Sequence, residues 1–467
     1  MKAAFGRVNI TPKDYKGRTL AGYTPIPLCS GKLDDIFASV FLFEDKKEYL
    51  ILITADFLKL PIAFTNYIKF KINEIFDIPP KNVLIHATHT HKSFDQGGEF
   101  QFSGGWAGVM KGVMFGAYYA DDKYNVWITS KLLTLLQGLK KNLRKCKIAW
   151  KKQTIEDDLI INRRHPTRMS KSDLGLIVIN EINSPTNIGT IVTFSSHPTT
   201  LNFSIDKLSA DYPGQLVHHL EEISNGKLNV AFFTAPCADL NPITTCGTEF
   251  EKLSKNPNSQ FNENEIYQQY GTYEHTKKLG FTLAEKAHEL FLSLKEDEFI
   301  ENFTFSAYLR TFYMPMKDFT NYKSKVWLSN RLKFMFKRWL LIQIPLVMAN
   351  SKKPNFPGFS IQRGKGEVVA ETAVQILKIE TNKKQLLITG IPGELFEDIA
   401  REFYETSPLG RENTFIFQNS NDWIGYLLPL EEYVQEGGYE AFTSFSPLAG
   451  EYVRKNYYEL LKEAEHV

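Results

Sequence analysis

Short apolar runs alternate with longer stretches of helical periodicity along most of the chain. Apolar runs between turn signals predict strands, and apolar residues that recur every three or four positions predict helices. The predicted strands are 38–43, 49–55, 83–87, 174–179, 189–194, 228–234, 303–312, 373–379 and 385–389. The predicted helices are 61–76, 126–143, 265–294 and one within 447–464. This alternation predicts an α/β fold, with mixed β-sheets packed together and flanked by helices.

The composition allows a large buried core. The chain has 467 residues, of which 43% are hydrophobic and 23% are charged. This length predicts one unit over residues 1–467, built as a single body or as two intimately packed lobes, roughly 1–300 and 301–467. A formal net charge of only +2 argues against a nucleic-acid-binding protein that neutralises phosphates.

No targeting or membrane-spanning segment is visible in the sequence. The first residues lack the apolar region of a signal peptide, and no run of about 18 apolar residues occurs. Four cysteines are few for this length and form no CxxC pair, which predicts mostly reduced thiols. They are Cys29, Cys146, Cys237 and Cys246. These features together predict a cytoplasmic protein.

Histidines are concentrated in one segment. Three of the ten, His86, His89 and His91, lie at the end of the apolar run 83–87 or just after it. If that run is a strand, side-chain alternation places His89 and His91 on one face. Two neutral imidazoles side by side suit a zinc site. A single His-x-His pattern more often marks hydrogen-bonded core or loop histidines, so partners elsewhere must decide between the two.

Other predicted strands also end in polar residues. His197 follows the strand 189–194, and Glu394 follows the strand 385–389 at a glycine-flanked turn. Strand ends that meet at one edge of a sheet are where α/β proteins usually form sites. Taken singly, His197 is better explained as a hydrogen-bonded loop histidine and Glu394 as a carboxylate at a helix start. Asp211 opens a predicted helix, either as its N-cap or as an acceptor that supports a metal ligand.

Taken in order, these segments resemble the neutral ceramidase family of zinc amidases. The resemblance runs through nearly the whole chain and rests on several short motifs in the family's order. They are 6–12, 20–23, 31–34, 88–91, 196–198, 210–214, 392–394 and Tyr426. The resemblance implies a neutral-ceramidase-like catalytic domain, and it predicts that the C-terminal sandwich domain of the longer members is absent.

The same resemblance implies hydrolysis of the amide of N-acylsphingosine with one catalytic Zn²⁺ ion. The positions that hold the ion are matched by His89, His197, Glu394 and Tyr426. His91 matches a neighbouring catalytic histidine, and Arg163 matches an arginine that lines the amide pocket. Two imidazoles and a carboxylate leave a zinc position for water, whose pKa the ion lowers to about 7. His91 and Arg163 suit an oxyanion, and His91 also suits proton transfer to the leaving amine.

Two departures from the family pattern bear on the substrate. Asn241 stands before Pro242 where the family carries a serine. An asparagine can donate a hydrogen bond to an oxyanion but cannot act as an activated hydroxyl, so Asn241 stays in the predicted catalytic set with a changed role. Residues 92–94 replace a small, proline-containing segment. They open a stretch over 92–122, rich in glycine and aromatic residues, that predicts an active-site loop.

The segment 327–350 alternates basic and aromatic residues before an apolar stretch. It predicts either a membrane-surface helix that guides lipid into the cleft, or a core-packed helix followed by a strand. The sequence thus leaves three functions open. They are a zinc-dependent ceramidase-type amide hydrolase, a related hydrolase of a smaller substrate, and a non-catalytic binding relative. A small-molecule or lipid substrate is the predicted partner.

Overall fold

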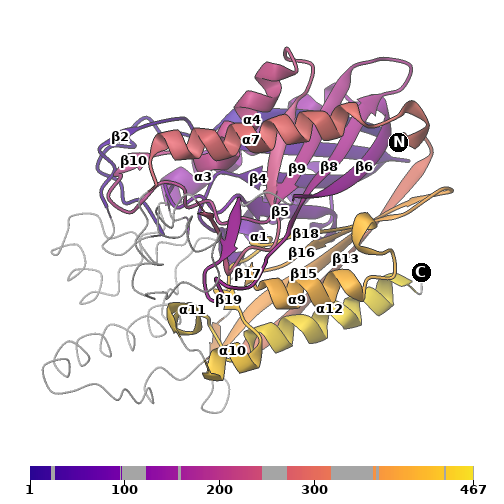
Figure 1. Cartoon of the computed structure of the whole chain (residues 1–467). Helices are drawn as coiled ribbons and strands as arrows, with labels where there is room; N and C mark the ends of the chain where they lie inside the picture. The colour runs from indigo at the N-terminus through magenta and orange to yellow at the C-terminus, as the bar shows by residue number, and fades with distance from the viewer. Residues whose placement is uncertain are drawn as a thin grey trace, which may run out of the picture.

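The computed structural model describes residues 1–22, 27–94, 96, 122–155, 159–243, 271–316, 361–363, 368–435 and 438–465. Two β-sheets lie face to face, and helices cover the outer face of each sheet (Figure 1). The predicted fold class, mixed sheets packed together and flanked by helices, is confirmed. The arrangement therefore has four layers, helices, sheet, sheet and helices.

The larger sheet has eight strands in the order β11-β9-β8-β6-β1-β3-β4-β5. Its neighbouring strands are antiparallel, except for the parallel pairs β4–β5 and β9–β11. The strands are β1 (Lys2–Asn9), β3 (Phe37–Asp45), β4 (Glu48–Ala55), β5 (Val83–Ala87), β6 (Arg144–Ile155), β8 (Ser172–Glu181), β9 (Asn187–Phe194) and β11 (Val230–Thr234).

This sheet is buried on both faces, which explains its continuous apolar runs. In β4, Ile51 and Ile53 face the helices, whereas Leu50 and Leu52 face the second sheet. The outer face is covered by α1 (Ile62–Phe76), α3 (Asp122–Lys141), α4 (Asp211–Ile223) and α7 (Tyr273–Leu292).

The second sheet has five strands in the order β13-β15-β16-β18, with β14 also paired to β15. Its strands are β13 (Phe303–Pro315), β14 (Ile361–Arg363), β15 (Val368–Thr381), β16 (Leu386–Gly390) and β18 (Thr414–Phe417). The helices α9 (Glu397–Glu405) and α12 (Ala449–Glu465) pack on its outer face. Two short helices, α10 (Leu430–Gln435) and α11 (Gly438–Thr443), stand at the end of this layer near β17 and β19 (Figure 1).

One apolar cluster joins the inner faces of the two sheets. Leu84 and Phe233 of the larger sheet pack in it with Ile388 and Phe417 of the second sheet. Each fully buried side chain of this size contributes about 1.5–3 kcal/mol, so the cluster holds the sheets in a fixed alignment. The division into one body or two lobes stays a prediction.

Three short strand pairs stand at the ends of the sheets. They are β2 (Gly31–Lys32) with β10 (Lys207–Leu208), β7 (Ile160–Asn162) with β12 (Leu240–Pro242), and β17 (Glu394–Leu395) with β19 (Tyr426–Leu427). Three single turns of 3₁₀-helix complete the described elements: η1 (Pro80–Asn82), η3 (Glu296–Glu298) and η5 (Arg411–Asn413). The short pairs β7–β12 and β17–β19 carry residues that were predicted for the site.

The predicted strands are confirmed, with ends that move by a few residues. The first, second and last predicted helices are confirmed as α1, α3 and α12. The third is confirmed as α7, and residues 265–270 of that prediction lie outside the described residues. Among the described helices, none is both long enough and apolar enough to cross a lipid bilayer.

Candidate metal centre

The two histidines that follow β5 converge for a different reason from the predicted one. β5 ends at Ala87, so strand alternation does not extend to His89 and His91, and that part of the prediction is wrong. Instead, His89 adopts a left-handed φ of 69°. Its N–H donates to the carbonyl of Phe57 at 2.9 Å, and the N–H of His91 donates to Pro198 at 3.3 Å. A tight loop, held at both histidines, therefore turns both rings inward.

His86, the third histidine of this segment, belongs to the core. Its Nδ1 lies 2.8 Å from the Thr54 hydroxyl, and its Nε2 accepts from the Thr234 N–H at 3.0 Å. Its ring stacks on Phe233 with the centroids 4.9 Å apart. Of the three histidines in this segment, His86 alone is the hydrogen-bonded core histidine that the sequence pattern left open.

His197 lies just beyond β9 and is fixed by its backbone. Its N–H donates to the Leu240 carbonyl at 2.9 Å. Asp211 holds the following turn, because its carboxylate accepts from the N–H of Thr200 at 3.2 Å and of Leu201 at 3.1 Å. Asp211 is the first residue of α4 and follows the N-cap Ala210, so the predicted N-cap role is wrong. It supports the chain segment that carries a predicted ligand.

Glu394 enters the centre from the segment that follows β16 of the second sheet. It opens β17, and its N–H donates to the Gly425 carbonyl at 3.0 Å. A Cβ atom on Gly393 would lie 2.6 Å from the same carbonyl oxygen, so only glycine allows β17 and β19 to approach this closely. Tyr426 is the register partner of Glu394 in this parallel pair. The sequence at this turn thus sets where the carboxylate lies.

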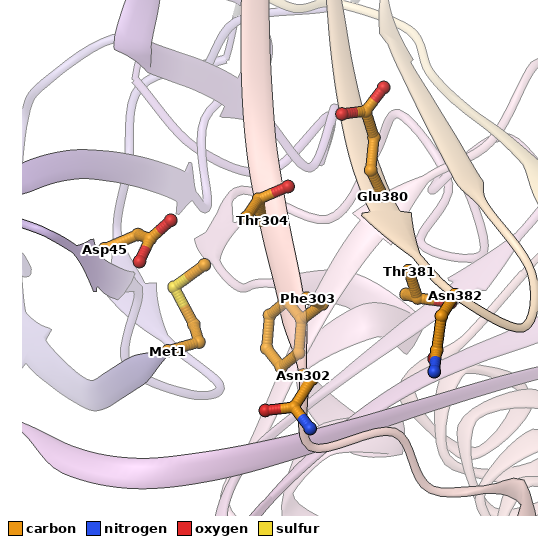
Figure 2. Close-up of a pocket in the computed structure, with 8 residues that line it drawn as sticks. All are labelled: Met1, Asp45, Asn302, Phe303, Thr304, Glu380, Thr381 and Asn382. Atoms are coloured by element: carbon orange, nitrogen blue, oxygen red, sulfur yellow. The ribbon is translucent and has the colours of Figure 1, made fainter.

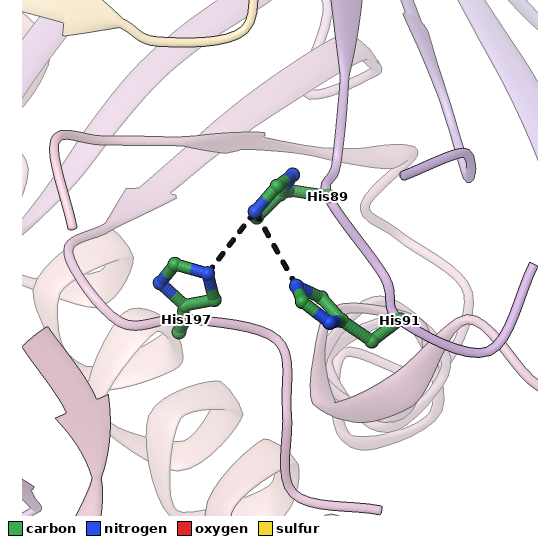
Figure 3. Close-up of side chains that lie close together, drawn as sticks. All are labelled: His89, His91 and His197. Atoms are coloured by element: carbon green, nitrogen blue, oxygen red, sulfur yellow. Dashed lines mark hydrogen bonds between the residues drawn. The ribbon is translucent and has the colours of Figure 1, made fainter. Parts of the chain in front are cut away.

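Four side chains from these segments meet at one point. The Nε2 atom of His89 lies 3.1 Å from Nε2 of His197 and 3.4 Å from Nε2 of His91 (Figure 3). The Oε2 atom of Glu394 lies 3.2 Å from Nε2 of His89 and 3.3 Å from Nε2 of His197. The ligand atoms of the three histidines all lie within 4.8 Å of one another. His89, His197 and Glu394 are buried, and His91 is half-buried.

Hydrogen bonds on the far side of each ring decide which nitrogen faces the centre. Each Nδ1 is paired with a backbone carbonyl: His89 with Leu58 at 2.6 Å, His197 with Cys237 at 2.9 Å, and His91 with Gly22 at 3.1 Å. A carbonyl oxygen only accepts, so each Nδ1 carries the hydrogen. In the neutral rings, every Nε2 then presents a lone pair to the centre.

The charge of the centre favours a cation. Burial opposes ionisation of Glu394, but the neighbouring His89 and His197 outweigh it and hold the pKa of the carboxyl well below its usual value. Burial lowers the pKa of His197 to about 4 and lowers that of His91 well below its usual value. With the three rings neutral, three lone pairs and the Glu394 carboxylate face one another. A proton on one ring would satisfy one of these contacts, whereas a metal ion would satisfy all of them.

The spacing fits zinc. Zinc–ligand bonds of about 2.0–2.1 Å in tetrahedral geometry place neighbouring ligand atoms about 3.3 Å apart. The triangle formed by His89, His197 and Glu394 has edges of 3.1, 3.2 and 3.3 Å, and the edge from His89 to His91 is 3.4 Å. The donor atoms present thus suit zinc in type, in charge and in spacing.

The remaining predicted residues line this centre. Arg163 directly follows β7, and its Nη1 lies 3.4 Å from Nδ1 of His197 and donates to Oδ1 of Asn241 at 2.8 Å. Its guanidinium carbon lies 5.6 Å from the ring of Tyr426. Its Nε donates to the buried Glu440 at 3.0 Å. The structure thus brings all seven predicted site residues into one region, and their individual roles stay predictions.

No protein-family model matches the sequence, and no curated protein matches it. Among solved structures, the neutral ceramidase from Pseudomonas aeruginosa matches with a TM-score of 0.69 and 14% identity, over 98% of this chain and 74% of that chain. A ceramidase complexed with C2 matches with a TM-score of 0.69 and 13% identity, over 100% of this chain and 75% of that chain. The chain has the neutral ceramidase fold.

The ceramidase fold positions two further residues that sequence reasoning did not assign to the site. Glu440 of α11 pairs with both Arg163 and Arg164 at 3.0 Å. Trp423 donates from its indole to Oε1 of Glu394 at 2.9 Å. Trp423 lies within a polar, glycine-containing segment that ends in Tyr426. This composition indicates only weakly that Trp423 belongs to the site. Nothing in the sequence indicates that Glu440 pairs with these arginines.

Several predictions fall on other parts of the chain. Most of the predicted active-site loop 92–122, namely 95 and 97–121, lies outside the described residues, as do 327–350 and Cys246. Cys29, Cys146 and Cys237 are buried free thiols.

A shallow groove of about 410 Å³ lies where the ends of β3, β13 and β15 meet, and Figure 2 shows the residues that line it. Met1, Asp45 and Phe303 line it, and Asp45 is the last residue of β3. The other end of β3 begins at Phe37, whose N–H donates to Asp56. Phe37 therefore lies at the end of the sheet that carries the metal centre. The groove is therefore separate from the histidine cluster.

Asp34 is connected to the histidine segment by hydrogen bonds, and it is expected to make the free energy of unfolding depend on pH. Its carboxylate accepts from the Ser209 hydroxyl and the Ala210 N–H, both at 2.6 Å. The Ser209 carbonyl in turn accepts from the hydroxyl of Thr90, between His89 and His91, at 2.8 Å. Burial raises the pKa of Asp34 to about 7, against the opposing effect of these hydrogen bonds.

The folded protein thus keeps a proton on Asp34 up to about pH 7, whereas the unfolded chain loses it near pH 4. Between these values the folded state binds more protons, so the free energy of unfolding falls as pH rises, by about 2–4 kcal/mol from this carboxyl. Asp34→Asn is expected to flatten that fall in urea unfolding of metal-free protein. The neighbouring Asp35→Asn is the control and is expected to keep it. Equal pH profiles for wild type and Asp34→Asn would contradict the assignment.

Proposed function

We propose that the protein is a zinc-dependent hydrolase that cleaves the amide bond of ceramide or of a related N-acyl substrate. The observation that carries this proposal is the convergence of three Nε2 lone pairs and the Glu394 carboxylate at the spacing of a zinc site. The likeness to solved ceramidase structures supports the reaction class.

His89, His197 and Glu394 would hold the ion, with Tyr426 beside them as the fourth predicted ligand. Zinc bound there would supply Lewis acidity and lower the pKa of a coordinated water to about 7. His91, whose Nε2 lies 3.4 Å from Nε2 of His89, would pass a proton to the leaving amine.

Arg163 provides positive charge for the oxyanion of the attacked carbonyl. Its direction is set on two sides, by Oδ1 of Asn241 at 2.8 Å and by Glu440 at 3.0 Å. A guanidinium held in this way loses little freedom when it meets the substrate. In this scheme Asn241 acts by orienting Arg163.

A second candidate keeps the same chemistry but takes a smaller substrate. It is favoured by Asn241, which stands where the ceramidases carry a serine and which uses its carbonyl oxygen on Arg163. The substrate contacts that a serine would make are then absent. Membrane contact through 327–350 stays a prediction.

The test compares substrates and metal content on one purified preparation. N-acylsphingosines and short N-acyl amides are offered side by side, with zinc measured by elemental analysis. Cleavage of N-acylsphingosine by protein with one zinc per chain supports the first proposal. Cleavage of the short amides alone moves the assignment to the smaller substrate. A chain that binds no zinc and cleaves neither is a non-catalytic binding relative.

Zinc is also expected to stabilise the folded protein. At a free zinc concentration 100 times the Kd, the free energy of unfolding rises by about 2.7 kcal/mol, because only the folded chain assembles the donors. Differential scanning calorimetry of metal-free protein, with and without added zinc, measures this rise. An unfolding temperature that does not respond to zinc would contradict the proposed centre.

A further inference from the structure

The two oxygens of the Glu394 carboxylate have different partners. Oε1 accepts a hydrogen bond from the indole Nε1 of Trp423 at 2.9 Å. Oε2 lies 3.2 Å from His89 and 3.3 Å from His197, and it accepts no aligned hydrogen bond within the described part of the chain. Both residues are buried, with 8% of Trp423 and 2% of Glu394 exposed. The indole thus takes one oxygen and leaves the other to the histidines.

Trp423 is itself held in place from several sides. The ammonium group of Lys59 lies 4.1 Å from the centroid of the indole, a cation–π contact. Phe445 meets the indole edge to face at 5.9 Å. The preceding residue, Asp422, accepts from the N–H of Ile62 at the start of α1 at 2.9 Å. The indole therefore cannot follow the carboxylate if the carboxylate rotates.

The dipeptide Leu58-Lys59 connects the contacts that hold Trp423 to the histidines. The Leu58 carbonyl accepts from Nδ1 of His89 at 2.6 Å and thereby fixes that ring. The next residue, Lys59, lies over the indole that binds Glu394. A predicted nitrogen ligand and a predicted oxygen ligand are thus oriented from the same short segment after β4.

We propose that Trp423 is a positioning residue of the metal centre, which makes Glu394 a ligand through Oε2 alone. This inference rests on the proposed function. A carboxylate can bind a cation through one oxygen or through both, and a charge-assisted hydrogen bond to Oε1 opposes the second mode. Keeping Glu394 monodentate leaves a coordination position open for water or substrate, as a catalytic zinc site requires.

The test compares Trp423→Phe with Phe445→Leu. Both variants reduce the same aromatic packing, but only Trp423→Phe removes the N–H that binds Oε1. Zinc affinity is measured by competition with a chromogenic chelator, and the unfolding temperature is measured on metal-free protein. Trp423→Phe is expected to bind zinc about 10–100-fold more weakly, the usual effect of removing a group that orients a ligand. Phe445→Leu is expected to keep the wild-type zinc affinity despite a lower unfolding temperature.

Cobalt substitution gives a second readout that does not depend on activity. The visible absorption of Co²⁺ weakens as its coordination number rises, so loss of the indole N–H is expected to weaken this absorption when the second oxygen of Glu394 also binds. Equal zinc affinity in the two variants, with unchanged cobalt spectra, would overturn the positioning role and leave the proposed function standing. Failure of the wild-type chain to bind zinc would overturn both.

Discussion

Replacing His197 by alanine is expected to abolish most of the zinc binding and with it the hydrolysis of the amide substrate. Zinc bound by four protein ligands is stabilised by about 10–16 kcal/mol, so one ligand accounts for about 3–4 kcal/mol. That loss weakens zinc binding by about 10²–10³-fold. The effect is large here because His197 supplies one of the two imidazoles in the predicted ligand set and is itself buried.

Metal content after dialysis against a weak chelator, followed by hydrolysis at saturating substrate, measures both effects. His219→Ala is the matched control. His219 lies on α4, and it contacts Glu222, Glu285 and the ring of Phe281. The control is expected to keep both zinc and activity. A His197→Ala protein that retains one zinc per chain would rule out His197 as a ligand.

Glu440→Gln is expected to lower the free energy of unfolding by about 3–5 kcal/mol, the usual effect of breaking a buried ion pair from one side. Glu440 has no exposed surface and binds both Arg163 and Arg164 at 3.0 Å. Glutamine keeps the shape but removes the charge, which leaves two buried guanidinium groups facing a neutral amide. Hydrolysis is expected to fall as well, because Arg163 loses one of the two contacts that direct it.

Glu432→Gln separates the role of Glu440 from a general effect of charge. Glu432 also binds Arg164 at 3.0 Å, but its other partner is His165, whose side chain is 34% exposed. Its replacement is expected to cost about 1–2 kcal/mol and to leave zinc binding unchanged. Urea unfolding and kinetic assays on both variants measure the difference. Equal destabilisation by the two changes would show that Glu440 has no special role in holding Arg163.

The layered α/β architecture could be predicted because burial on both faces gives uninterrupted apolar runs, as in β4 and β5. The same criterion missed β1 and β6, which lie side by side in the middle of the larger sheet. β6 carries several lysines and an arginine along its 12 residues, and only part of it is fully buried. The alternating pattern of β1 is similarly diluted by Lys2 and Arg7.

His89, His197 and Glu394 each follow an apolar run at a turn, and only the resemblance to the ceramidase family joined them with Tyr426 into one predicted ligand set. Their convergence could not be derived in that way. His89 reaches the centre through a left-handed loop conformation, which alternation along a strand does not describe. The contacts that orient the site join residues far apart in the chain, such as Arg163 and Glu440, which are 277 positions apart. Local patterns carry no information about such pairs.

The packing of the two sheets limits how far one sheet can shift relative to the other before the side chains of the centre separate. The imidazoles follow strands of one sheet and the carboxylate follows β16 of the other, so the distance between them depends on how the two sheets are aligned. A slip of one layer by a single residue shifts it by about 3.3 Å, as much as the whole His89–Glu394 separation. Each layer would survive such a slip intact, yet no ion could then bridge them. Ion binding would therefore depend on correct assembly of the two sheets, which apolar side chains outside the centre determine.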